Sequence, residues 1–224
     1  MQPPEAVLRG ACSALGLAVS EPQVAQLLAY LALLERWNAT YNLTAVRDPA
    51  AMLTQHLADC LAVVPPFARY LAGRAGRAGD AGDASLRVLD VGSGGGLPAA
   101  VLATMLHRCD VTSVDAVGKK AAFVRQVAGA LGLPNLHAVH GRVERLNVPP
   151  FDVITARAFA SLAALVSLTK PALARRGCWA AMKGRHPEDE IAALPADVAV
   201  FHVEPLVVPG LDAQRCLVWM QPAP

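Results

Sequence analysis

Apolar residues recur at helical spacing near the start of the chain. Ser20 precedes this stretch and Gln23 stands three residues later, the pattern of a capping box that begins a helix. One face of the expected helix carries Val24, Leu27, Leu28, Leu31, Leu34 and Trp37. The pattern therefore predicts a helix that begins just after Ser20, and similar spacing predicts a second helix over 50–67.

Between these helices the apolar period is interrupted. The stretch "WNATYNLTAVRDP" at 37–49 combines asparagines and threonines with an Asp-Pro pair, a composition typical of a loop. On the second helix, His56 and Asp59 are three positions apart, so we expect their side chains to share one face.

From residue 86 onward the pattern alternates between strands and helices. Apolar, β-branched runs predict strands at 87–91, 110–115, 137–141, 151–157, 177–183, 198–206 and 215–221. Helical windows between the first five lie at 98–107, 119–132, 143–147 and 161–177. This alternation predicts an α/β fold with a seven-stranded, doubly wound, mainly parallel sheet. The last two runs have no long helix after them, which favours an antiparallel edge.

A Gly/Ala tract with alternating charge, "GRAGRAGDAGDAS", occupies 73–85. Such a composition cannot build a core, so it predicts a linker or surface loop. The sequence thus divides into an N-terminal helical region, 1–72, this linker, and a main domain, 86–224.

Composition excludes several classes of protein. The longest apolar runs are about half of the ~20 residues that a membrane span needs, and no signal peptide is recognisable. The five cysteines lack metal-ligand spacing and the six histidines form no cluster, so we expect a cytoplasmic protein without a metal site. The net charge of +2 neither requires nor excludes a nucleic-acid partner.

The segment "LDVGSGGGLP" at 89–98 carries the most specific chemistry. It places a glycine-rich turn at the exit of the first expected strand, where doubly wound sheets bind ligands. Two patterns compete here. A dinucleotide fingerprint fits Gly94, Gly96 and Ala99. The alternative, D-x-G-x-G-x-G through Asp90, Gly92, Gly94 and Gly96, is the pattern of S-adenosylmethionine-dependent methyltransferases, and the Asp90 carboxylate would attract a cationic cofactor and repel a pyrophosphate.

Two further acids are candidates for contact with an adenosine cofactor. Asp115 ends the second expected strand, where an acid can accept hydrogen bonds from ribose hydroxyls in either class of cofactor. Glu144, with the backbone near Val143, follows the third strand and is placed to meet an adenine edge. Both could instead be ordinary surface acids.

Five motifs in the same order resemble the bacterial small-subunit ribosomal RNA guanine-N7 methyltransferase family (RsmG, or GidB). They are "RWNATYNLTAVRDP", "LDVGSGGGLP", "GKKAAFVRQV", "ITARAFASL" and "MKGRHPEDEI", and the similarity runs from about residue 20 to 220. The resemblance implies a class I methyltransferase fold and methyl transfer from S-adenosylmethionine to N7 of one guanine in 16S ribosomal RNA. It also implies a cofactor site that includes Gly92, Leu97, Val143, Glu144 and Arg157.

The expected reaction needs no general base, because guanine N7 is a lone-pair acceptor without a proton. The protein has to align the reactants and exclude water, while the cofactor carries the activated methyl group. A base in an A-form duplex presents N7 in a groove that side chains cannot enter, so we expect an unpaired or extruded target.

Cations near the strand exits are candidates for contact with that RNA. Arg157 and Lys183 follow the fourth and fifth expected strands and are the predicted catalytic residues, with Arg185 as a further candidate for phosphate or guanine O6. Asn38, Asn42, Arg47 and His56 are expected on the substrate side. The expected partner is 16S ribosomal RNA or the small ribosomal subunit, bound by a monomer. A nicotinamide-dependent oxidoreductase and a non-catalytic RNA-binding protein remain as alternatives.

Overall fold

The computed structural model describes residues 2–75 and 85–223. In the N-terminal part, helical elements are α1 (Pro4–Ala14), α2 (Glu21–Tyr41), α3 (Pro49–Met52), the π-helix η1 (Leu53–Ala58), α4 (Asp59–Leu61) and α5 (Val64–Ala75). The main domain contains β1 (Leu86–Val91), α6 (Ala99–Met105), β2 (Cys109–Asp115), α7 (Gly118–Ala130), β3 (Leu136–His140), the 3-10 helix η2 (Val143–Arg145) and β4 (Phe151–Arg157). It continues with α8 (Leu162–Thr169), the 3-10 helix η3 (Lys170–Ala172), β5 (Leu173–Lys183), α9 (Glu188–Ala192), β6 (Val198–Leu206) and β7 (Arg215–Pro222).

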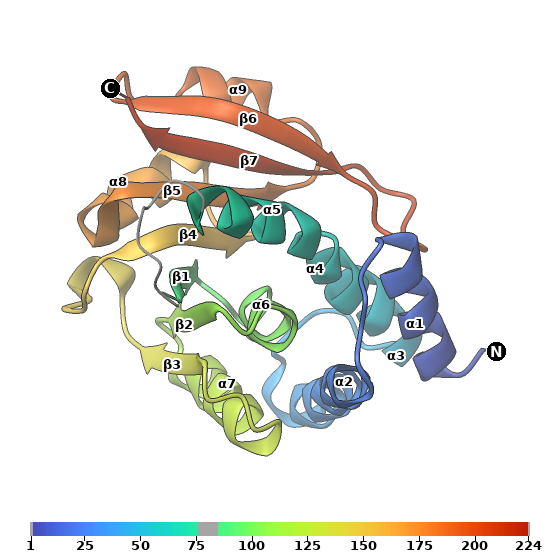
Figure 1. Cartoon of the computed structure of the whole chain (residues 1–224). Helices are drawn as coiled ribbons and strands as arrows, with labels where there is room; N and C mark the ends of the chain where they lie inside the picture. The colour runs from blue at the N-terminus through green and yellow to red at the C-terminus, as the bar shows by residue number, and fades with distance from the viewer. Residues whose placement is uncertain (1, 76–84, 224) are drawn as a thin grey trace.

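The seven strands form one sheet in the order β3-β2-β1-β4-β5-β7-β6 (Figure 1). Pairing is parallel from β3 to β5, whereas β7 runs antiparallel to both β5 and β6. This is the class I methyltransferase fold that the sequence predicts, and the expected antiparallel edge is confirmed. Because the order reverses at β1 and β4, the exits of these two strands flank the switch point where ligands bind.

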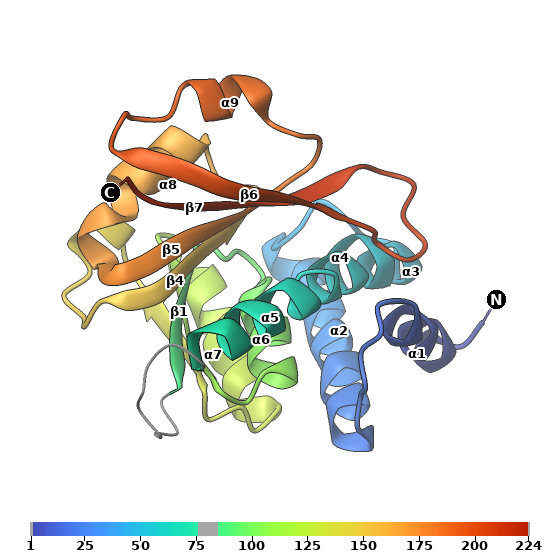
Figure 2. The same ribbon diagram turned by 45° about the horizontal axis from the view of Figure 1, so that its top comes forward.

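Helices cover both faces of the sheet, with α5, α6 and α7 on one face and α8 and α9 on the other (Figures 1 and 2). Alternation along β1 sends Val88 into the core on the first face and Leu89 into the core on the second. Both residues are fully buried. All five cysteines are buried and free.

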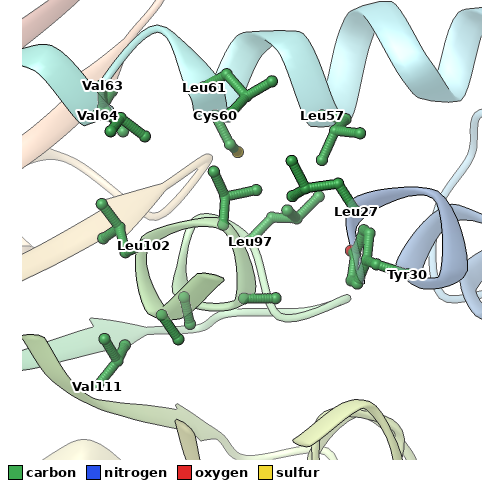
Figure 3. Close-up of a cluster of buried hydrophobic side chains, with 14 of the residues drawn as sticks. Leu27, Tyr30, Leu57, Cys60, Leu61, Val63, Val64, Leu97, Leu102 and Val111 are labelled. Carbon is green, nitrogen blue, oxygen red and sulfur yellow. The ribbon is translucent and has the colours of Figure 1, made fainter. Parts of the chain in front are cut away.

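The N-terminal helices share their core with the sheet. Leu27 and Tyr30 of α2 lie in the same cluster as Leu57 of η1 and Leu97 of the glycine loop (Figure 3). The predicted capping box is present, since the Ser20 side chain accepts from Gln23 N–H and the Gln23 side chain accepts from Ser20 N–H. The proposed division at residue 72 therefore separates regions of different composition that share apolar contacts.

Two sequence predictions need correction. Helix α2 continues to Tyr41, the fifth residue of the expected loop over 37–49, and ends at Asn42, which adopts a left-handed conformation. The helix expected over 161–177 is wrong beyond Ala172, because Pro171 cannot continue a helix and Leu173 pairs with Phe151 of β4. A shift of register between Phe151 and Val153 accommodates the extra residues of β5.

The predicted linker at 73–85 falls largely outside the described residues. Helix α5 includes positions 73–75, and residues 76–84 are not described. Over the described ranges, 2–75 and 85–223, no helix combines the length and apolar character that crossing a bilayer requires.

Candidate functional site

Two neighbouring cavities lie at the carboxyl ends of β1, β2 and β4. The first, of about 420 Å³, is lined by Gly92, Asp115, Val143, Glu144 and Phe159 among others. The second, of about 310 Å³, is lined by Gly92, Gly94, Leu97, His56, Arg157 and other residues. Gly92 and Lys120 border both cavities, so the two spaces meet at the glycine loop. This arrangement brings together most of the residues that the sequence indicates for a cofactor.

The glycines of the loop are required for different structural reasons. Gly92 and Gly96 have φ values of +65° and +77°, and a Cβ atom would lie 2.9 Å from the Phe159 ring and 2.9 Å from Val124 Cγ2, respectively. Gly94 also has a positive φ, +57°, but a Cβ there would meet only Gly92 O at 4.0 Å. Thus Gly92 and Gly96 permit close packing of the loop, whereas Gly94 leaves space open beside the second cavity.

The Asp115 carboxylate, at the end of the neighbouring strand β2, binds the backbone of the glycine loop. Its Oδ2 accepts from Gly94 N–H at 3.0 Å and its Oδ1 accepts from Val117 N–H at 2.8 Å. Each carboxylate oxygen can accept a further hydrogen bond, so Asp115 can also receive ribose hydroxyls in the first cavity. The acidic lining by Asp115 and Glu144, together with the glycine backbone, fits the adenosine part of a cofactor. The predicted cofactor residues Asp115, Val143 and Glu144 therefore lie together.

Asp90 occupies a different environment from the one that the sequence suggests. Its side chain is fully buried, its Oδ2 accepts from Ala99 N–H at 3.2 Å, and its Oδ1 has no partner among the described residues. Burial raises the pKa of Asp90 to about 7, although Ala99 N–H and the Arg157 charge oppose this effect. The sequence predicts that this carboxylate attracts the cofactor through its charge, and that role stays a prediction. The hydrogen bond from Ala99 N–H makes the side chain a support that ties the end of β1 to the start of α6.

Arg157 enters the second cavity from the end of β4 and contacts the N-terminal region. Its Nη1 lies 3.2 Å from Gln55 O, 3.3 Å from Asp59 Oδ2 and 3.4 Å from His56 Nδ1. These three residues belong to η1 and the first turn of α4, and π-turns within helices are frequent at functional sites. The expectation that His56 and Asp59 share a face is confirmed, because both contact the same guanidinium.

The surroundings of His56 favour its neutral imidazole form. Burial and the nearby Arg157 charge lower its pKa, in that order of importance. Its Nε2 lies 2.7 Å from Thr44 Oγ1, while Nδ1 faces the Arg157 donor. We assign the proton to Nε2 because Arg157 can only donate. Both ring nitrogens of His56 are therefore engaged.

The loop over 42–48 borders the same cavity through Leu43 and Thr44. Asn38 fixes the loop, since its side chain accepts from Thr44 N–H at 2.9 Å and donates to Val46 O at 3.0 Å. Arg47 is exposed and donates to Asn42 Oδ1 at 2.7 Å. Of the residues expected on the substrate side, Asn38 and His56 are thus buried supports, whereas Asn42 and Arg47 are exposed.

Lys183 and Arg185 are absent from the described lining of both cavities. Lys183 Nζ donates to Glu190 at 2.7 and 3.0 Å and to Ala160 O at 3.2 Å. Glu190 also accepts from Leu162 N–H at the start of α8. This ion pair holds the loop after β4, so a direct catalytic role for Lys183 stays a prediction without geometric support.

Sequence reasoning missed several residues of the site. Tyr30 donates from α2 to Gly95 O at 2.7 Å, and Lys120 lies 3.9 Å from Asp115 Oδ2. Ala158 lines the second cavity with a φ of +53°, a conformation that costs free energy for a residue with a Cβ. Only Lys120 carried a sequence signal, as part of a basic pair in a family motif.

Comparisons with known proteins identify the family to which the chain belongs. The family described as "GidB: rRNA small subunit methyltransferase G" matches residues 23–218. A relative from Acidovorax sp. (strain JS42), named "Ribosomal RNA small subunit methyltransferase G", is 58% identical over 97% of this chain and 95% of its own length. A protein of the same name from Leptothrix cholodnii is 58% identical over 99% of this chain and 97% of its own.

The fold also has counterparts among solved structures. One described as "Conversion of a Disulfide Bond into a Thioacetal Group during Echinomycin Biosynthesis" aligns with a TM-score of 0.50 and 16% identity. It covers 61% of this chain and 76% of the other. At this identity the similarity concerns the fold alone.

Proposed function

The chain belongs to the rRNA small subunit methyltransferase G family, a family of S-adenosylmethionine-dependent enzymes, and from this premise we propose its reaction in more detail. We propose that it transfers a methyl group from S-adenosylmethionine to N7 of one guanine in 16S ribosomal RNA. The observation that carries this proposal is the near-complete match at 58% identity to proteins named for methylation of small-subunit ribosomal RNA.

The charges of the two cavities suggest an orientation for the cofactor. The first cavity carries the acids Asp115 and Glu144, which suit the hydroxyls and amino group of adenosine. The second carries the cation Arg157 beside the backbone of Gly92 and Gly94, which suits a carboxylate. When bound, S-adenosylmethionine supplies a methyl group already activated by its sulfonium.

The second cavity also offers a place for the acceptor base. Leu34, Leu43 and Leu97 give it apolar walls, which favour exclusion of water. Guanine N7 has no proton to lose, so the reaction requires alignment in line with the methyl group and no general base. Among the described residues that line this cavity, His56 is the side chain best suited to act as a general base. Both of its ring nitrogens already have hydrogen-bond partners. This supports a mechanism in which the protein positions the two reactants and removes no proton.

The target guanine has to leave a stacked helix to reach this cavity. A-form RNA presents N7 in a deep, narrow groove, so an unpaired or extruded base is the expected substrate. We propose that a monomer of this protein binds 16S ribosomal RNA, alone or within the small subunit, in the cytoplasm. Exposed Arg47 and Arg185 are candidates for phosphate contacts.

Methyl transfer to ribosomal RNA tests the proposal directly. Small subunits from a strain that lacks the enzyme are incubated with labelled S-adenosylmethionine, and the modified nucleotide is mapped. We expect one N7-methylguanine in 16S RNA, while subunits that already carry the modification take up no label. Label in a different nucleotide, or tight cofactor binding without labelled RNA, would contradict the proposed acceptor.

A further inference from the structure

Asp59 is a buried carboxylate held between two arginines from different strands. Its Oδ2 lies 3.3 Å from Arg157 Nη1 of β4, and its Oδ1 accepts from Arg215 Nε of β7 at 2.7 Å. The Asp59 side chain is 5% exposed, so its charge requires these partners to compensate for lost hydration. The segment of η1 and α4 is thereby joined to two strands at the edge that forms the site.

The contacts of Arg157 leave one side of its guanidinium available. All of its hydrogen bonds within the described part of the chain use Nη1, which is shared among Gln55 O, His56 Nδ1 and Asp59 Oδ2 at 3.2–3.4 Å. These distances are at or beyond the long end for N–H···O bonds, and the Asp59 charge adds to the attraction. Neither Nε nor Nη2 donates to the described residues, and Arg157 lines the second cavity, so these donors can meet a ligand there.

We infer that Asp59 is a positioning residue, which holds Arg157 so that the free side of its guanidinium receives the carboxylate of the cofactor's amino-acid end. The inference rests on the proposed function, because it takes the occupant of the two cavities to be S-adenosylmethionine. Asp59 itself does not line either cavity among the described residues, so it acts through Arg157.

The geometry explains why this task falls to the N-terminal region. Strand β4 ends at Arg157, and Ala158 turns the chain away with a positive φ, so a neighbouring element has to fix the side chain. The segment of η1 and α4 offers a backbone carbonyl, a neutral imidazole and a carboxylate within about one turn. Neutral His56 matters here, because a protonated imidazole would repel the guanidinium.

The test compares two ligands that differ at the amino-acid end. S-adenosylhomocysteine carries the carboxylate, whereas 5′-methylthioadenosine keeps the adenosine and the thioether but lacks the amino acid. We expect Asp59→Asn in the full-length chain to raise the Kd of S-adenosylhomocysteine by about ten- to hundredfold, the range for loss of one hydrogen bond to a charged group. The Kd of 5′-methylthioadenosine should change less than twofold.

A matched control lies at the opposite end of β4, near the start of the strand. Asp152 also binds an arginine, Arg74 Nη2 at 2.9 Å, and accepts from Arg87 N–H at 3.0 Å. Asp152→Asn should lower thermal stability and leave the ratio of the two dissociation constants as in the wild type. If Asp59→Asn does not fold, Asp59→Glu replaces it, because the longer side chain keeps the charge but displaces the carboxylate.

The outcomes separate this inference from the proposed function. Equal weakening of both ligands by the Asp59 variant would mean that Asp59 supports the fold and does not position Arg157. Equal dissociation constants of the two ligands for the wild-type protein would also overturn the inference, since the carboxylate would then contribute nothing to binding. Failure of the wild type to bind either ligand would instead refute the cofactor assignment on which the inference rests.

Discussion

Because the carboxyl group of Asp90 is buried, we predict that the free energy of unfolding falls as pH rises through neutrality. The side chain is 0% exposed, and burial raises its pKa from 3.8 to about 7. Because the folded state holds this proton more tightly than the unfolded state does, stability is highest below pH 4 for this group and is lost as pH rises through about 7. The change that isolates the effect is Asp90→Asn, since an amide resembles the protonated acid and does not titrate.

The magnitude follows from the two pKa values. A rise from 3.8 to about 7 makes ionisation cost the folded state about 4 kcal/mol, and about 2–3 kcal/mol of this falls between pH 5 and pH 8. For a chain of 224 residues, 1 kcal/mol corresponds to about 2–4 °C in Tm. Between pH 5 and pH 8 the wild type should therefore lose about 5–10 °C more than the Asn variant.

Thermal unfolding without cofactor, followed by circular dichroism at half-unit steps from pH 5 to pH 8, measures this difference. Asp212→Asn makes the same chemical change at an exposed position, and its pH profile should follow that of the wild type. Parallel profiles for the wild type and Asp90→Asn would refute the reasoning, because they would show that Asp90 does not titrate in this range.

Three further predictions address the loop, the cofactor and the RNA. Gly96→Ala should lower the free energy of unfolding by about 2–3 kcal/mol, because φ is +77° and the new Cβ meets Val124 Cγ2 at 2.9 Å; chemical denaturation measures the loss, and Val124→Ala should restore part of it. Asp115→Asn should raise the Kd of S-adenosylhomocysteine about ten- to hundredfold by calorimetry, and an unchanged Kd would contradict the ribose contact. Arg185→Ala should reduce the slope of log K for RNA against log salt by about 1, whereas Lys183→Ala, whose ammonium is bound by Glu190, should not.

Much of the fold was predictable because apolar patterning decides it. Each of the seven strands lies where a β-branched run predicts one, and the Ser20 capping box marks the start of α2. Prediction failed where tertiary pairing overrides local propensity. Leu173 follows an apolar helix in the sequence, but it pairs with Phe151 of β4 and therefore belongs to β5. The π-turn at 53–58 had no local signal.

The site was predictable where spacing along one segment defines it. Gly92, Gly94 and Asp115 lie at strand exits, and the parallel sheet brings such exits to one edge. Tyr30 and Thr44 could not be found in this way, because they reach the site from distant segments through packing of the N-terminal helices. Asp90 is also a weaker attractor of a cationic cofactor than the sequence suggests, because burial raises its pKa to about 7.

The N-terminal helices therefore contribute to the site in a way that composition does not suggest. Tyr30 of α2 binds the carbonyl of Gly95 in the glycine loop, and Asp59 binds Arg157 at the end of β4. These contacts fix the two strand exits that flank the switch point, and Gly95 and Arg157 both line the second cavity. A sheet with these strands alone would keep the glycine turn but would lack the supports that hold the loop and the guanidinium in place. The geometry of the candidate site is thus a property of the helical region and the sheet together.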